Sequence, residues 1–149
     1  MANSVQIDPR GPDWPLGNIV VPTPGTPVNI MSIVDPTNAN DPATLAPSAT
    51  GVTKMEYTPK FQQIIFQGFK AGANGLIVNT GNVYIVRKPI GAGSGGHNDL
   101  GCIVFCVTPG QTFVLAGSYM SGDMWSPYRY SIDADTANDA CQVTGIVGG

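Results

Sequence analysis

The first 60 residues of this chain contain ten of its thirteen prolines, concentrated in the segments 8–15, 22–27 and 35–47. Each proline holds φ at about −65° and removes a backbone N–H donor, and the residue before it is pushed toward extended geometry. A helix and a central strand are therefore both excluded for this segment. We expect an extended arm over residues 1–55 and a separate β domain over residues 56–149.

The arm is also apolar. Trp14–Leu16, Ile19–Val21 and Val28–Val34 are rich in bulky or β-branched residues, whereas disordered tails are rich in charge and poor in such residues. A stiff, nearly uncharged arm must lie on its own β domain or on a neighbouring subunit. We expect it to anchor a partner through its bulky side chains, which are Trp14, Ile19, Val21 and Ile30.

Charge is scarce throughout the 149 residues. Asp, Glu, Lys and Arg make up 11% of the chain, against about 25% in an average soluble protein. The formal net charge is −3 and the one adjacent basic pair is Arg87-Lys88, a composition that argues against a nucleic-acid surface. No apolar run approaches the roughly 20 residues of a membrane span, and Met1–Arg10 does not resemble a secretory signal, so we expect synthesis in a cytoplasm.

The cysteines do not predict a disulfide framework, because their number, three, is odd. Cys102 and Cys106 lie four residues apart in an apolar run. On one strand they would be about 13 Å apart, which is too far for a bridge. We interpret them as small buried apolar residues.

Short apolar runs separated by glycine-rich turns indicate strands over the second half of the chain. The runs are 61–69, 76–78, 83–86, 101–107, 112–116, 128–132 and 141–147. The first also fits a helical face through Phe61, Ile65 and Phe69, but its Ile and Phe content and the following 72–75 turn favour a strand in a hairpin. The run 101–107 is continuously apolar and predicts a strand covered on both faces. The pattern predicts an antiparallel all-β domain, either a small sandwich of jelly-roll type or a barrel.

Three motifs suggest chemistry and none has the context that the chemistry needs. Residues 91–96 match G-x-G-x-x-G, but a proline precedes them and a strand follows, so no helix N-terminus can meet a phosphate. His97 is the single histidine, which leaves a zinc site short of ligands. Residues 133–139 resemble a calcium loop without its glycine and glutamate, and we predict a turn with side-chain-to-backbone bonds there. We therefore predict no catalytic, metal or cofactor site, and no enzyme.

The aromatic residues Trp125, Tyr128 and Tyr130, flanked by Met120 and Met124, form the remaining candidate site. Aromatic and Met side chains are enriched in protein interfaces. These side chains could equally cover the core or form a sugar-binding platform.

Three phrases in the β domain carry a family resemblance: residues 79–85 (NTGNVYI), 107–113 (VTPGQTF) and 130–135 (YSIDAD). Together with the Pro/Gly-rich arm they are similar to phrases of small tailed-bacteriophage virion proteins, most of all capsid decoration (cement) proteins. The resemblance implies a homotrimer on the outer capsid surface that bridges neighbouring major capsid subunits and stabilises the shell.

Two other classes stay open at this point. A receptor- or glycan-binding module of a virion fibre or tail would require Trp125, Tyr128 and Tyr130 to be exposed together around a groove. A small jelly-roll enzyme would require a clustered polar pocket, which is hard to build from one His and one Glu.

Overall fold

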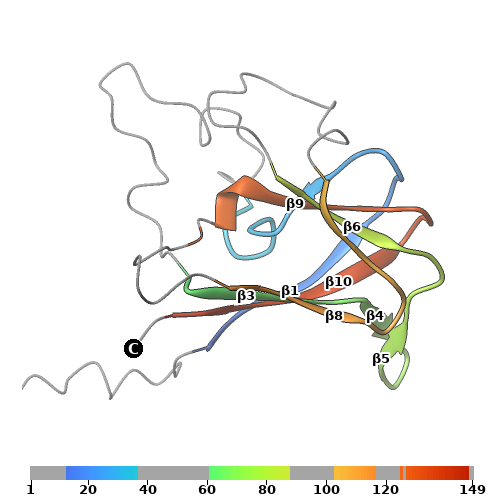
Figure 1. Ribbon diagram of the computed structural model, residues 1–149. Helices are drawn as coiled ribbons and strands as arrows, with labels where there is room; N and C mark the ends of the chain where they lie inside the picture. Colours follow the sequence, from blue (N-terminus) through green and yellow to red (C-terminus); the bar gives the residue numbers. More distant parts are fainter. Residues whose placement is uncertain (1–12, 37–60, 88–102, 117–124, 126, 148–149) are drawn as a thin grey trace, which may run out of the picture.

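The computed structural model describes residues 13–36, 61–87, 103–116, 125 and 127–147 (Figure 1). They form two four-stranded antiparallel sheets, called here sheet A (order β1-β10-β3-β8) and sheet B (order β2-β9-β6-β7), and a separate β4-β5 hairpin. The strands are β1 (Asp13–Val21), β2 (Val28–Asn29), β3 (Gln63–Gln67), β4 (Phe69–Gly72), β5 (Gly75–Val78), β6 (Val83–Arg87), β7 (Ile103–Val107), β8 (Thr112–Ala116), β9 (Tyr130–Ala134) and β10 (Asp139–Ile146). A short 3-10 helix, Pro127–Arg129, precedes β9.

The strand pairing is nested. The first strand pairs with the last (β1 with β10), β2 pairs with β9, β3 pairs with β8, and β6 pairs with β7. Two further pairs, β10 with β3 and β9 with β6, join these ribbons side by side into the two sheets. This is the arrangement of an eight-stranded jelly roll, with the β4-β5 hairpin inserted between β3 and β6. The predicted all-β sandwich is confirmed.

The core lies between the two sheets, as Figure 1 shows by their layered arrangement. Side chains alternate between the faces of each strand, so Ile64 and Phe66 of β3 point inward with Val143 of β10 beside them. The fully buried large side chains come from both sheets and from the segments beside them: Leu16, Ile19, Val21, Ile30, Phe61, Ile64, Phe66, Val83, Ile85, Val86, Val107 and Ile132.

The predicted boundary between an arm and a β domain at residue 55 is wrong for residues 13–36. β1 pairs with β10 from Asp13↔Ile146 to Val21↔Asp139, and β2 pairs with β9. β1 is the outer strand of sheet A, and an outer strand tolerates proline because the N–H groups on its open side make no ladder bond. The rest of the expected arm lies outside the described residues.

A bulge at Gly17 lets β1 follow β10. The register shifts between Pro15 and Gly17, and Gly17 has φ of 107°, which favours glycine. A Cβ at Gly17 would also lie 2.7 Å from the Cδ1 atom of Ile33. The positive φ selects glycine at this point in the strand, whereas the exposed Ile33 side chain could move aside.

The run 61–69 is a strand and not a helix, but it is divided at Gly68. The Gly68 N–H donates to the Gln111 carbonyl over 2.9 Å, and a Cβ there would lie 2.7 Å from the Thr108 carbonyl oxygen. This close approach of two backbones ends β3 and redirects the chain into β4. The turn predicted at residues 72–75 joins β4 to β5, as expected.

The predicted coverage of 101–107 on both faces is wrong for β7, the outer strand of sheet B, because Ile103 and Val104 point to opposite faces and are both exposed. Ile103 and Val104 are 43% and 38% exposed.

The strand expected at 128–132 starts at Tyr130 instead. Residues 91–96, His97, Cys102, Met120 and Met124 lie outside the described residues, and Cys106 and Cys141 are free thiols.

Candidate interaction surface

The acidic residues of the suspected calcium loop are used for turns and backbone contacts. Asp133 Oδ1 accepts the N–H groups of Gly25 and Ala134 over 2.9 and 2.8 Å, while the Asp135 carboxylate accepts the Tyr84 hydroxyl. The predicted turn with side-chain-to-backbone bonds is confirmed. Within the described residues no group of three or more His, Cys, Asp or Glu side chains could hold a metal ion.

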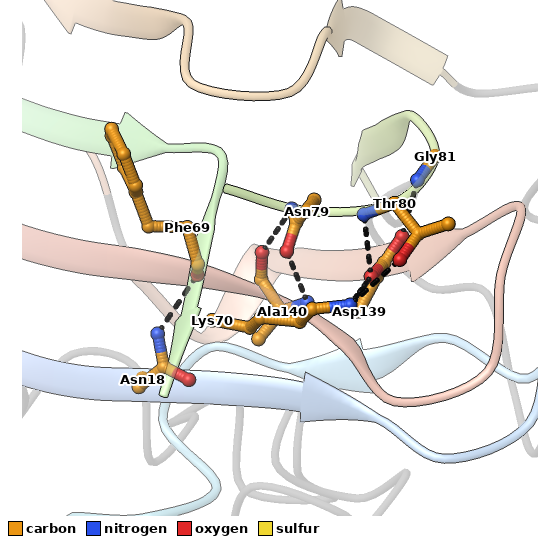
Figure 2. A network of polar contacts seen from close by, with 8 residues as sticks. All are labelled: Asn18, Phe69, Lys70, Asn79, Thr80, Gly81, Asp139 and Ala140. Carbon is orange, nitrogen blue, oxygen red and sulfur yellow. Dashed lines mark hydrogen bonds and ion pairs between the residues drawn. The ribbon is translucent and has the colours of Figure 1, made fainter. Parts of the chain in front are cut away.

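One buried carboxylate ties the β4-β5 region to sheet A (Figure 2). Asp139, at the start of β10, has no exposed side-chain surface and accepts a 2.7 Å bond from the Lys70 ammonium. It also accepts the N–H groups of Thr80 and Gly81 over 3.0 and 2.6 Å. Burial alone would raise the pKa of Asp139, but the Lys70 charge and the two amides outweigh burial and hold the pKa below its ordinary value.

Asn79 extends sheet A beyond the end of β3. Its side-chain Nδ2 donates to the Ala140 carbonyl over 2.6 Å, and its Oδ1 accepts the Ala140 N–H over 3.1 Å (Figure 2). The side-chain amide thus supplies the donor and acceptor that a neighbouring strand would offer to β10. On the β1 side, Asn18 Nδ2 donates to the Phe69 carbonyl over 3.0 Å. The hairpin is therefore held at its base from both sides.

Beyond this base, the hairpin exposes aliphatic side chains. Leu76, Ile77 and Val78 occupy consecutive positions of β5 and are 52%, 49% and 52% exposed. Because successive side chains of a strand point to opposite faces, both faces of the hairpin are open. Figure 1 shows the hairpin at one end of sheet A with its tip turned away from sheet B.

The outer face of sheet A is almost uncharged. The strand registers place three rows of side chains across it: Asp13, Ile146, Gln63 and Ala116; Pro15, Thr144, Ile65 and Val114; and Asn18, Gln142, Gln67 and Thr112. Asp13, at one corner, is the charged member of these rows. Three outward residues of β6 and β9 in sheet B are covered by comparison, since Val86, Ser131 and Asp133 are 0%, 2% and 3% exposed.

The side of the sandwich between β7 and β8 is only partly closed. Phe105 of β7 and Phe113 of β8 stack with ring centroids 4.1 Å apart and an interplanar angle of 12°. Both rings pack against the core and remain partly exposed. We define the candidate interaction surface as the outer face of sheet A together with Leu76, Ile77 and Val78 of the hairpin.

The expected arm anchors lie elsewhere. Ile19, Val21 and Ile30 are buried in the protein's own core, with 1%, 0% and 0% exposure. They cannot anchor a partner in the folded protein, because their apolar surface is already used in folding. Trp14 is half-buried, and its ring forms a T-shaped pair with the ring of Phe61, with centroids 6.0 Å apart.

The three candidate aromatic side chains, Trp125, Tyr128 and Tyr130, pack against the core and do not form an exposed group. Tyr128 and Tyr130 are 4% and 2% exposed, and Trp125 packs against the core beside Phe61, with which it forms an isolated β-bridge. The Tyr128 hydroxyl donates to the Asp35 carboxylate. Burial, and then this bond, raise the pKa of Tyr128. The exposed aromatic groove that the glycan-binding alternative requires is therefore not formed by these side chains.

Sequence reasoning missed both parts of the surface. It identified 76–78 as a strand, but three aliphatic residues in a row usually signal a buried strand, and nothing local shows that this one has no second sheet above it. The uncharged rows on sheet A follow from pairing registers between residues more than 40 positions apart. A low charge content is the one signal in the sequence that agrees with such a face.

Comparison with known protein families, with curated proteins and with solved structures finds no match to this chain. In the part of the chain that the structure describes, no helix has the length and apolarity needed to cross a bilayer.

Proposed function

We propose that this protein is a structural virion protein that decorates a phage capsid and stabilises it by bridging neighbouring major capsid subunits. The observation that carries the proposal is the candidate interaction surface, in which a broad uncharged sheet face lies beside three exposed aliphatic side chains. Exposed aliphatic side chains such as those of the hairpin mark protein-interaction sites, and the sheet face beside them is largely polar but carries a single charge, Asp13. The partner is suggested by the three phrases that resemble decoration proteins.

The proposed mechanism is mechanical. Each bound oligomer, a homotrimer in our proposal, contacts several shell subunits, so the loss of any one subunit must also break its contacts with the bridge. Ligands that bind only the assembled state stabilise it by mass action as sites fill. Attachment rests on apolar burial and backbone hydrogen bonds, because Asp13 is the one charge in the three rows of sheet A.

The surface can be tested with an Ile77→Asp variant in a co-sedimentation assay with candidate capsids that lack the protein. A charge at this 49% exposed position should reduce capsid occupancy by roughly tenfold or more, since burying an unpaired carboxylate is costly. Val34→Asp is the matched control, because Val34 has the same 49% exposure and lies off the proposed surface. Equal binding by both variants and the wild type would exclude the hairpin as an attachment element.

Salt dependence and heat resistance test the mechanism independently. Raising salt from about 0.1 to 1 M shortens the Debye length from roughly 10 to 3 Å and should leave occupancy nearly unchanged. An occupancy that collapses over this range would show an electrostatic attachment.

Particles stripped of the protein should lose heat resistance, and undiminished resistance would contradict the stabilising role. Light scattering that shows only a 15.5 kDa monomer would contradict the trimer.

A further inference from the structure

The basic residues of the described part are not distributed evenly. Three of the seven Lys and Arg residues of the chain lie in it: Lys70, Arg87 and Arg129. Lys70 is paired with the buried Asp139. The other two lie together at one end of sheet B, because Arg87, the last residue of β6, is the register partner of Tyr130, and Arg129 directly precedes Tyr130 in the chain.

This end of sheet B brings two separate elements together. Arg87 is exposed at the end of a strand, and Arg129 is half-buried in the short helix that leads into β9. Figure 1 shows this helix at the start of β9. The two arginines thus come from two different elements, which meet at the Arg87–Tyr130 pair.

Neither arginine has a carboxylate partner among the described residues, where the ion pair is Lys70–Asp139. Burial, and then the positive charge of Arg87, lower the pKa of Arg129. Burial raises the pKa of Tyr130, and the positive charges of Arg87 and Arg129 oppose this effect by lowering it. Although the chain is acidic and poor in charge, the positive charges of Arg87 and Arg129 lie near each other at one end of sheet B and repel each other.

We propose that Arg87 and Arg129 form a binding site for a tetrahedral dianionic group, with the chemistry of a sulfate or a phosphate ester. Two positive charges match the charge of such a group. Each guanidinium presents five N–H donors in a planar fork, and two forks from different elements suit an anion with three or four oxygens better than a planar carboxylate, which one fork already satisfies. The site is independent of the proposed capsid attachment, which uses the other sheet.

The test is an NMR titration of the full-length protein with inorganic sulfate and, separately, with inorganic phosphate at pH 7.5. Sodium chloride at matched ionic strength corrects for screening. We expect a saturable shift of the Arg87 and Arg129 side-chain Nε–Hε resonances with at least one anion and no saturation with chloride. The stronger anion identifies which ester the site takes. Shifts with both anions that are no larger than those with chloride would overturn the proposal.

Two variants make the test specific. Arg87→Gln and Arg129→Gln should each weaken anion binding by about tenfold or more, as expected for the loss of charge-assisted hydrogen bonds. Thr112→Asp is the control, because it changes the net charge by the same amount on the exposed outer face of sheet A and should bind the anion as the wild type does. Unchanged binding by both arginine variants would overturn the proposal, and since Arg87 is exposed, its variant should fold.

Discussion

At the scale of single residues, one buried carboxylate with several partners ties the fold of this protein together. The Asp139 carboxylate accepts hydrogen bonds from one ammonium group and two backbone amides. Removing one partner of a buried pair is costly because the other is left without compensation. In a chain with so little charge, one such group can dominate the acid stability of the molecule.

The first prediction concerns the pH dependence that follows from Asp139. Its folded pKa lies below its ordinary value of 3.8, so the unfolded state binds a proton more readily than the folded state. The contribution to stability is therefore present above the ordinary pKa and is lost as pH falls through the folded pKa. Asp139→Asn should cost about 3 kcal/mol at pH 7 and flatten the dependence below pH 4.

Urea unfolding between pH 7 and pH 2.5 measures this effect. Asp135→Asn is the matched control, because Asp135 is an exposed carboxylate four residues earlier that bonds the Tyr84 hydroxyl. The control should retain the acid-dependent loss of the wild type. If Asp139→Asn and the wild type lose stability in parallel below pH 4, Asp139 is not the group responsible.

At the scale of elements, the β4-β5 hairpin depends on contacts made at its base. Two-stranded hairpins are at best marginally stable alone. The strands of this one bear the exposed Leu76, Ile77 and Val78. Its position must therefore come from the contacts at its base, which are made by Asn18, Lys70, Asn79 and the close approach at Gly68. The surface that we propose for attachment is thus rigid only as far as these contacts hold.

The second prediction is that Asn79→Asp loosens the hairpin. A carboxylate can accept the Ala140 N–H but cannot donate to the Ala140 carbonyl, and the buried carbonyl is left without a partner. We expect a loss of about 1–3 kcal/mol and faster amide hydrogen exchange in residues 69–79. Asn74→Asp, the same substitution at the exposed turn of the hairpin, should change neither. Unchanged exchange in Asn79→Asp would show that the base is held by other contacts.

At the scale of the whole molecule, the nested pairing makes the ends of the chain interdependent. β1 pairs with β10 along its length, so the last strand needs the first to complete sheet A. Leu16, Ile19, Val21 and Ile30 all come from residues that would otherwise be an arm. At about 1.5–3 kcal/mol for each buried side chain, they contribute roughly 6–12 kcal/mol of burial, comparable to the total stability of a domain.

The third prediction follows from this dependence. A variant that starts at Val52 lacks β1 and β2 and should show no cooperative unfolding and poorly dispersed NMR spectra. A variant that starts at Asp13 keeps every described strand and should unfold cooperatively. Thermal unfolding followed by circular dichroism distinguishes the two. Cooperative unfolding of the shorter variant would mean that residues 13–36 are dispensable for the fold.

Much of the fold could be predicted from sequence because it depends on local chemistry. Short apolar runs between turns predicted the strands around 83–86, 112–116 and 141–147. The glycines at 72 and 75 predicted the hairpin turn, and Asp133 predicted side-chain-to-backbone bonds. Proline correctly excluded helices from residues 13–36, the described part of the first segment, since its effect on φ and on hydrogen bonding acts at the residue itself.

What only the tertiary structure decided depends on pairing between distant residues. Proline at position 15 excludes a central strand but allows an outer one, and whether β1 finds such a place is decided by β10, more than a hundred residues later. The same holds for exposure: Ile19 and Ile77 are both isoleucines in short apolar runs, yet one is 1% and the other 49% exposed. Burial is a property of what lies above a strand, and the strand's own sequence does not contain it.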